Sequence, residues 1–313
     1  MDNLDQITEI EQQYHQLVSD GAYAQALELV TRTAHLFPDY SQKIVYAWRM
    51  IMACRLHKRE LALELLQEAI AAGHWYTGLA EDDDFSILQG NPEFERLLGI
   101  CVERRAQAMA EAVPVMKVIR PEGYTAPYPL LFALHGNQSN LAEFAGHWMA
   151  ATEHGWLVGL PQSSQPFGPG TFSWNDWDWS LQEVQAHFAL LCSQYPIDPQ
   201  RVVLAGFSMG GGLAAWLALS GAISPRGLLL VNPFLSDVNH LVPILKAYHP
   251  QELRVYIGAG QRDAYCLGVA QQLAALLPKY SIICELEIFP DLEHNFPQQL
   301  ESSLPNVLEG LLG

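Results

Sequence analysis

The residues after Pro114 alternate between short apolar runs and longer segments with helical periodicity. Gly, Pro, Asn or Asp bounds most of the apolar runs. Strands that alternate with helices in this way form parallel sheets, so this part of the chain is predicted to be a doubly wound α/β domain. Strands are expected at 115–120, 129–134, 156–160, 201–206, 227–231, 254–258 and 282–289, and helices at 141–153, 180–194, 209–220, 240–247, 265–277 and 298–312.

The first 112 residues have a different pattern. Apolar residues recur there at spacings of three and four, with almost no β-branched runs, so this part is predicted to be all helical. Turn-forming residues at 19–21, 37–39 and 55–58 divide it into short antiparallel helices. We therefore expect two domains, a helical domain over 1–112 and an α/β domain over 113–313.

Part of the helical domain resembles a tetratricopeptide repeat. The segment Gly21-x-Tyr23-x-x-Ala26, closed by Pro38, is similar to the second helix of such a repeat, and Ala62 repeats Ala26 after 36 residues. The resemblance implies a helical-repeat-like domain. Two interpretations stay open, a surface for a protein partner or for self-association, and a helical cap with no binding role.

The chain is strongly acidic. It has 17 Lys and Arg against 34 Asp and Glu, a formal net charge of −17, which disfavours nucleic acid and anionic membranes as partners. No apolar run approaches the roughly 18 residues that span a bilayer, and the acidic N-terminus lacks a signal-peptide pattern. The five cysteines are scattered, so neither a disulfide framework nor a zinc site is expected. These features predict a cytoplasmic protein.

A serine lies at a sharp connection between an expected strand and an expected helix. The strand 201–206 runs into Gly206-Phe207-Ser208-Met209-Gly210, and the helix follows at once. A nucleophile on such a turn has strained backbone angles that leave no room for side chains two residues away on either side. Ser208 is therefore the expected nucleophile; the alternative is a glycine-rich turn with no chemistry.

A serine hydroxyl needs a general base, and the base needs a carboxylate to orient it. Where the nucleophile sits on a turn of this kind, the acid and the histidine follow it in that order, in loops after late strands. Asp263 and His294 meet this condition. Asp237 is an alternative acid, and His240 and His249 are less favoured bases.

A tetrahedral intermediate also needs two fixed hydrogen-bond donors. His135-Gly136-Asn137 follows the strand 129–134, so we expect the donors to be the backbone N–H groups of Asn137 and Met209. His135 and Gly136 are expected beside the substrate.

The segment 162–179 is rich in Pro and Gly and follows a parallel strand, which places it at the edge where such sheets bind ligands. Trp174 and Trp177 either line a substrate pocket or attach this loop to the N-terminal helices. Asp176 and Asp178 lack the ligand run of an EF-hand, so no metal is expected.

Together, His135-Gly136, the run from Gly206 to Gly211, Gly258-x-x-x-x-Asp263 and Glu293-His294 resemble the phospholipase/carboxylesterase branch of the α/β hydrolases, which includes acyl-protein thioesterases. The resemblance covers residues 113–313. It implies an α/β-hydrolase fold, a mostly parallel sheet with helices on both faces, and a serine esterase without a cofactor. The triad would be Ser208, Asp263 and His294, acting on a small-molecule carboxylic ester through an acyl-enzyme.

The resemblance has two departures. The segment 260–265 differs from the usual Gly-x-x-Asp-x-x-Val pattern, and the helical domain is foreign to the minimal enzymes. The substrate therefore stays open, because a thioesterase or a peptidase would use the same residues. An interaction protein with a vestigial hydrolase domain is the alternative from another class.

Overall fold

The computed structural model describes residues 3–38, 41–247 and 252–313, and the chain divides into two compact units. The first unit contains residues 1–112 together with 166–171, and the second contains 113–165 and 172–313. The segment 166–171, which the sequence analysis assigned to the α/β domain, thus groups with the helical unit.

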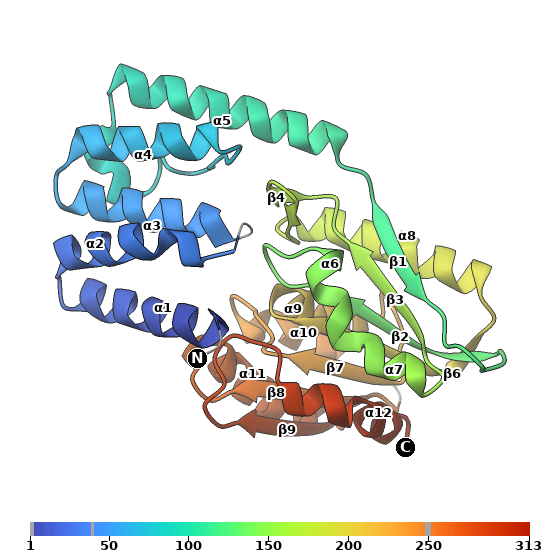
Figure 1. Cartoon of the computed structure of the whole chain (residues 1–313). Helices are drawn as coiled ribbons and strands as arrows, with labels where there is room; N and C mark the ends of the chain where they lie inside the picture. The colour runs from blue at the N-terminus through green and yellow to red at the C-terminus, as the bar shows by residue number, and fades with distance from the viewer. Residues whose placement is uncertain (1–2, 39–40, 248–251) are drawn as a thin grey trace. The chain divides into compact units, whose positions relative to one another are not determined.

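The first unit is built from helices that pack on their neighbours in the chain (Figure 1). Its main helices are α1 (Asn3–Ser19), α2 (Tyr23–Thr33), α3 (Gln42–Arg55), α4 (Arg59–Ala71) and α5 (Pro92–Glu111), with short 3-10 helices η1 (Ala34–Leu36) and η3 (Asp83–Leu88). One apolar core lies among α1, α2 and α3, and a second lies among α3, α4 and α5. The expected all-helical region is present, whereas its likeness to a tetratricopeptide repeat stays a prediction.

The second unit contains a seven-stranded sheet. Its strands are β1 (Val115–Ile119), β2 (Tyr128–Leu134), β3 (Leu157–Gln162), β6 (Ile197–Phe207), β7 (Gly227–Val231), β8 (Arg254–Gly260) and β9 (Ile283–Phe289). Their order is β1-β3-β2-β6-β7-β8-β9, and every pair is parallel except β1 with β3. The predicted parallel sheet is confirmed, with each expected strand within a few residues of its place. A two-stranded hairpin, β4 (Pro166–Gly168) with β5 (Thr171–Phe172), was not expected.

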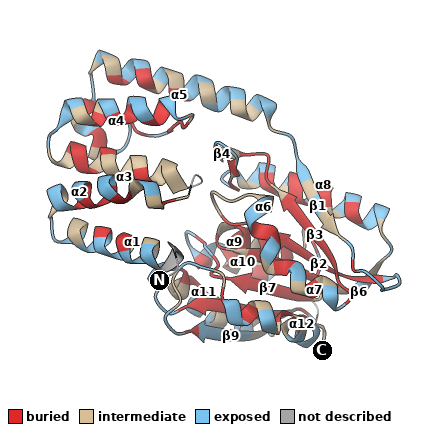
Figure 2. Cartoon of the chain, viewed as in Figure 1, coloured by how far each residue is buried: buried red, intermediate tan, exposed pale blue. Residues whose placement is uncertain are grey.

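Helices cover both faces of this sheet, as predicted. One face is covered by α8 (Trp177–Gln194), α9 (Met209–Leu219), α10 (Leu241–Ala247) and α11 (Ala264–Leu276). The other is covered by α6 (Leu141–Phe144), η4 (Ala145–Trp148), α7 (Met149–Glu153) and α12 (Gln298–Leu312). Side chains of β2 alternate between the two cores. The inner strands β2 and β7 are fully buried, whereas the edge strands β1 and β9 are partly exposed (Figure 2). The single helix expected at 141–153 is broken around Gly146, a poor helix former.

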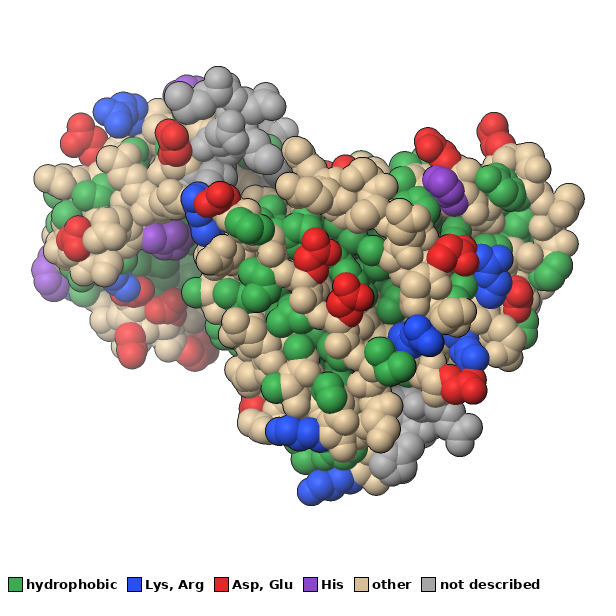
Figure 3. Space-filling view, turned by 90° about the horizontal axis from the view of Figure 1, so that it is seen from below, with side chains coloured by type: hydrophobic (Ala, Val, Ile, Leu, Met, Phe, Trp, Pro, Cys, Tyr) green, Lys and Arg blue, Asp and Glu red, His purple; other side chains and the backbone are tan. Residues whose placement is uncertain are grey.

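No helix in the described ranges combines the length and apolar composition needed to cross a bilayer. On the face drawn in Figure 3, basic side chains are scattered, and several lie beside acidic ones. This distribution agrees with the net charge of −17 and offers a polyanion no broad basic surface on that face.

Candidate functional site

Ser208 occupies the sharp connection between β6 and α9. Its φ of 53° and ψ of −121° are strained for a residue with a side chain. The flanking glycines make the turn sterically feasible, because a Cβ on Gly206 would lie 2.3 Å from the carbonyl oxygen of Gly210, and one on Gly210 would lie 2.3 Å from that of His135. The backbone geometry is therefore that of a nucleophile elbow.

Backbone hydrogen bonds hold Ser208 in this conformation. Its N–H donates to the carbonyl of Val231 at the end of β7 (2.9 Å), and its own carbonyl accepts from Phe234 (2.9 Å) and Gly212 (3.0 Å). The end of β7 with the residues after it, and helix α9, thus fix the strained residue, which is how a costly conformation persists in a folded protein.

His294 lies between the hydroxyl of Ser208 and the carboxylate of Asp263. Its Nε2 is 2.8 Å from Ser208 Oγ, and its Nδ1 is 2.5 Å from Asp263 Oδ2. Because a carboxylate only accepts, the imidazole proton is on Nδ1 and Nε2 is free to accept the serine proton. The three residues follow β6, β8 and β9, so the parallel sheet brings them to one edge.

Asp263 is held in its ionised form. Burial alone would raise its pKa, but the hydrogen bond and the charge interaction with His294, together with hydrogen bonds to Cys266, bring the pKa below its usual range. Its Oδ1 accepts from the backbone N–H of Cys266 in the first turn of α11 (3.2 Å). The carboxylate is therefore both fixed and charged.

The alternative acid has a different environment. Asp237 is exposed and caps the 3-10 helix η5 (Val238–His240), accepting hydrogen bonds from the backbone and side chain of Asn239. These bonds lower the pKa of Asp237, and none joins it to His294 within the described residues. His240 is exposed, and His249 lies outside the described residues.

The turn after β2 lies against Ser208. A Cβ on Gly136 would lie 2.8 Å from Phe207 Cδ1 and 3.5 Å from Ser208 Cβ, so only glycine fits at this approach. In the described part of the chain, the backbone N–H groups of Asn137 and Met209 donate to no other protein group. Both amides are thus available to an oxygen bound beside Ser208.

His135 is buried beneath this turn, to which it is hydrogen-bonded, and it does not line a pocket. It is fully buried, its Nδ1–H donates to the carbonyl of Gly136 (2.7 Å), and its Nε2 accepts from Ser163 N–H (3.1 Å). Burial lowers the pKa of His135 to about 4, so the ring is neutral near neutral pH. The expectation that His135 contacts substrate is corrected, because none of its surface is exposed.

Trp174 has the same supporting position. It is fully buried, and its indole N–H donates to the carbonyl of His135 (2.9 Å). The ring centroids of Trp174 and His135 lie 4.8 Å apart. It therefore packs beneath the turn, and the expected role as a pocket wall is corrected. Trp177 is partly buried and meets Trp216 of α9 edge to face, so its pocket role stays a prediction.

Asn232 joins the two loops that carry Asp263 and His294, and the sequence analysis did not identify it. It follows β7 directly, is fully buried and has a positive φ of 43°. Its side chain accepts from Gly260 N–H (2.7 Å) and donates to the carbonyl of Asn295 (2.8 Å). Its position at the carboxyl end of a buried parallel strand is the sequence signal that could have drawn attention to it, although not to its bonding partners.

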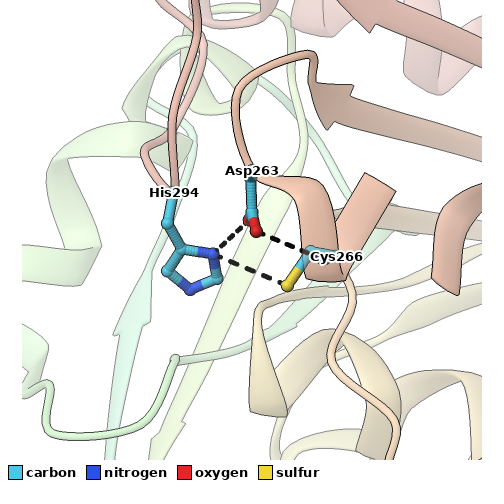
Figure 4. Close-up of side chains that lie close together, drawn as sticks. All are labelled: Asp263, Cys266 and His294. Carbon is cyan, nitrogen blue, oxygen red and sulfur yellow. Dashed lines mark hydrogen bonds and ion pairs between the residues drawn. The ribbon is translucent and has the colours of Figure 1, made fainter. Parts of the chain in front are cut away.

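Cys266 is a second residue that the sequence analysis did not place here. Its Sγ lies 3.6 Å from His294 Nδ1, on the side of the ring that also faces Asp263 (Figure 4). Burial and the nearby Asp263 carboxylate raise the pKa of this thiol. A neutral thiol therefore sits beside the histidine and acid pair.

Comparisons with known proteins agree with this architecture. Residues 8–109 match the family model "A/B hydrolase-like, N-terminal domain". Rat S-formylglutathione hydrolase is 27% identical over 179 residues, which cover 47% of this chain and 60% of that protein. A protein of unknown character from Bacillus cereus has a similar structure, with a TM-score of 0.54, 22% identity, and coverage of 97% of this chain and 98% of its own.

The esterase PE8 also has a similar structure, with a TM-score of 0.54 and 16% identity over 63% of this chain and 99% of its own. These likenesses cover the sheet and its helices, so the expected fold is confirmed. The chain is an α/β-hydrolase-fold protein whose residues 8–109 match the A/B hydrolase-like N-terminal domain.

Proposed function

We propose that this protein is a serine hydrolase that cleaves carboxylic esters through an acyl-enzyme. The observation that carries the proposal is the hydrogen-bonded chain from Ser208 through His294 to Asp263, with the serine on a strained elbow. This arrangement supports nucleophilic catalysis, because it supplies a base to the hydroxyl and a carboxylate to the base.

In the first half of the reaction, Ser208 Oγ attacks the acyl carbon while His294 Nε2 takes its proton. Asp263 stabilises the imidazolium that results and holds the ring in the correct orientation. The carbonyl oxygen of the substrate becomes an oxyanion, which accepts hydrogen bonds from the amides of Asn137 and Met209 and lies near the N-terminus of α9. His294 then gives its proton to the alcohol that leaves.

In the second half, water replaces the alcohol. His294 takes a proton from the water, the hydroxide attacks the acyl carbon, and Ser208 leaves with its proton restored. The buried His135 and Trp174 keep the turn that bears Asn137 in place, so the donors need no reorganisation as charge develops.

Hydrolysis of p-nitrophenyl acetate and butyrate by the wild type and by Ser208→Ala tests the proposal. The wild type should release p-nitrophenol steadily, and Ser208→Ala should fall to a rate near the uncatalysed one. Equal and negligible rates for the two folded proteins would contradict the esterase proposal, and the alternative of an interaction protein with a vestigial hydrolase domain would then be favoured.

Likeness to rat S-formylglutathione hydrolase favours a second candidate, a thioesterase that uses the same residues. The proposed triad does not distinguish an oxygen ester from a thioester, because both substrates give the same acyl ester of Ser208. The kcat/KM values for an ester and a thioester of the same acyl group decide between them. A tenfold or greater preference for the thioester would favour the second candidate.

A further inference from the structure

Three different ligand groups meet on one side of the His294 ring. Asp263 and Cys266 lie at the start of α11, and His294 lies in the loop after β9. One carboxylate oxygen, the thiol sulfur and one imidazole nitrogen all lie within 4.8 Å of one another (Figure 4). A mixed set of nitrogen, oxygen and sulfur donors is typical of Zn²⁺ sites and is unsuited to Mg²⁺ or Ca²⁺.

The spacing of these atoms is close to that of a tetrahedral site. Zn–S and Zn–N bonds of about 2.3 and 2.0 Å at a tetrahedral angle put sulfur and nitrogen about 3.5 Å apart. The distance from Cys266 Sγ to His294 Nδ1 is 3.6 Å. The distance from His294 Nδ1 to Asp263 Oδ2 is 2.5 Å, so an ion would have to widen it by about 0.8 Å to reach a tetrahedral edge. The sulfur and the carboxylate oxygen lie within 4.8 Å of each other, and an ion would draw them to a similar edge.

The site allows that adjustment and is open to solvent. Residues 290–297, which carry His294, form no helix or strand, so the ring can move without breaking a regular element. The His294 side chain is 46% exposed, whereas that of Asp263 is 9% exposed and Cys266 is buried. An ion can therefore reach the ring from solvent and complete its coordination with water.

We propose that Asp263, Cys266 and His294 form a binding site for a zinc-like divalent cation, which switches the enzyme off. The cation binds Nδ1 in place of the imidazole proton, and that proton moves to Nε2 of the same ring. The thiol binds as a thiolate and releases its proton to solvent, and a water molecule takes the fourth position.

The inhibitory part of the inference rests on the proposed function. With its proton on Nε2, the neutral ring no longer accepts a proton from Ser208, and the adjacent cation disfavours a second proton on the ring. The cation also takes Asp263 away from its orienting bond. Zn²⁺ is thus a reversible inhibitor here, and the reaction itself uses no metal in this proposal.

Zinc binding can be measured without reference to activity. Chelator-treated full-length protein is titrated with Zn²⁺ by calorimetry, and with Co²⁺ to look for thiolate-to-cobalt charge-transfer absorption. Cys266→Ser and Cys266→Ala remove the sulfur ligand. Cys284→Ser is the matched control, because Cys284 is a half-buried cysteine on β9 outside the cluster. Ser208→Ala keeps all three ligands and removes the proposed nucleophile.

One Zn²⁺ per chain should bind to the wild type, to Cys284→Ser and to Ser208→Ala. With Co²⁺, each of the three should show the thiolate-to-cobalt charge-transfer band. Cys266→Ser and Cys266→Ala should lose the Co²⁺ charge-transfer band and bind Zn²⁺ at least about tenfold more weakly. The loss of a residue that only hydrogen-bonds to a metal ligand already lowers metal affinity by about that factor. The zinc-free rate of each variant is the reference for its own inhibition curve, because the Cys266 side chain lies 3.6 Å from His294 Nδ1. The zinc concentration for half inhibition should rise by the same factor.

Unchanged zinc affinity in both Cys266 variants, with the variants folded by circular dichroism, would overturn the site. Zinc binding that leaves wild-type hydrolysis unchanged would overturn the inhibitory role. If the wild type hydrolyses no ester but binds Zn²⁺ through Cys266, the proposed function fails while the metal site stands.

Discussion

Replacement of Asn232 tests whether the loops after β8 and β9 must be held together for catalysis. Asn232→Ala removes the acceptor of Gly260 N–H and the donor to the carbonyl of Asn295, both made by a fully buried side chain. Each group left unpaired costs about 1–3 kcal/mol, and alanine at a positive φ adds about 1 kcal/mol. We expect the α/β unit to lose about 3 kcal/mol of stability, near the lower end of that sum.

A loss of that size should lower the melting temperature of a unit of this length by about 6–12 °C. Activity should fall more sharply than stability, because the imidazole and the carboxylate lie on the two loops that Asn232 joins. A misplacement of about 1 Å can lower kcat about 100-fold. The assay is p-nitrophenyl acetate hydrolysis at 20 °C, where circular dichroism must show that the variant is folded.

Asn239→Ala is the matched control, because Asn239 is exposed and, among the described residues, its side chain bonds only to Asp237. It should change stability by less than about 0.5 kcal/mol and leave kcat unchanged. If Asn232→Ala melted within 1 °C of the wild type and kept its kcat, the account of how the loops are positioned would be wrong.

Three further predictions concern the same site. Asp263→Asn should lower kcat/KM about 10³–10⁴-fold while Asp237→Asn stays within about twofold of wild type, and the reverse ranking would identify Asp237 as the acid. Gly210→Ala should prevent folding or abolish activity, because its Cβ would lie 2.3 Å from the carbonyl oxygen of His135. A Cβ on Gly268 of α11 would have no described atom within 4 Å other than its chain neighbours and its own helix backbone, so Gly268→Ala should be neutral or stabilise by up to about 1 kcal/mol in thermal melts. The pKa of His135 is lowered from 6.5 to about 4, so the folded state binds fewer protons than the unfolded one between these values, and stability should fall by up to about 3 kcal/mol as the pH drops through this window. Urea denaturation from pH 7 to 4 checks this, and His135→Asn, less stable at pH 7, should show a shallower slope; equal slopes would exclude His135 as the source.

Local patterns in the sequence were sufficient to predict the strands of the sheet and the strained turn at Ser208. Each buried strand is an apolar run bounded by turn residues, and the steric demand at Ser208 is met by glycines two residues away on either side. The positions of Asp263 and His294 could be predicted because parallel strands end at one edge, so chain order alone selects the loops.

Contacts between distant residues could not be predicted in this way. Asn232 bonds to groups 28 and 63 residues further along the chain, and no local pattern encodes such a pair. The segment 166–171 groups with the helical unit, where Lys43 donates to the carbonyl of Phe167, although its composition suits any surface loop. Trp174 was expected either to line a pocket or to attach its loop to the N-terminal helices, but its indole N–H donates to the carbonyl of His135, far from it in the sequence.

The central claim is that His294 activates Ser208 as a nucleophile, and covalent labelling tests it most directly. The protein is treated with a fluorophosphonate, digested with trypsin and analysed by mass spectrometry. We expect one adduct, on Ser208 in the peptide 202–226, which is absent from Ser208→Ala and forms far more slowly on His294→Gln. An adduct on another residue, or equal labelling of the wild type and Ser208→Ala, would contradict it.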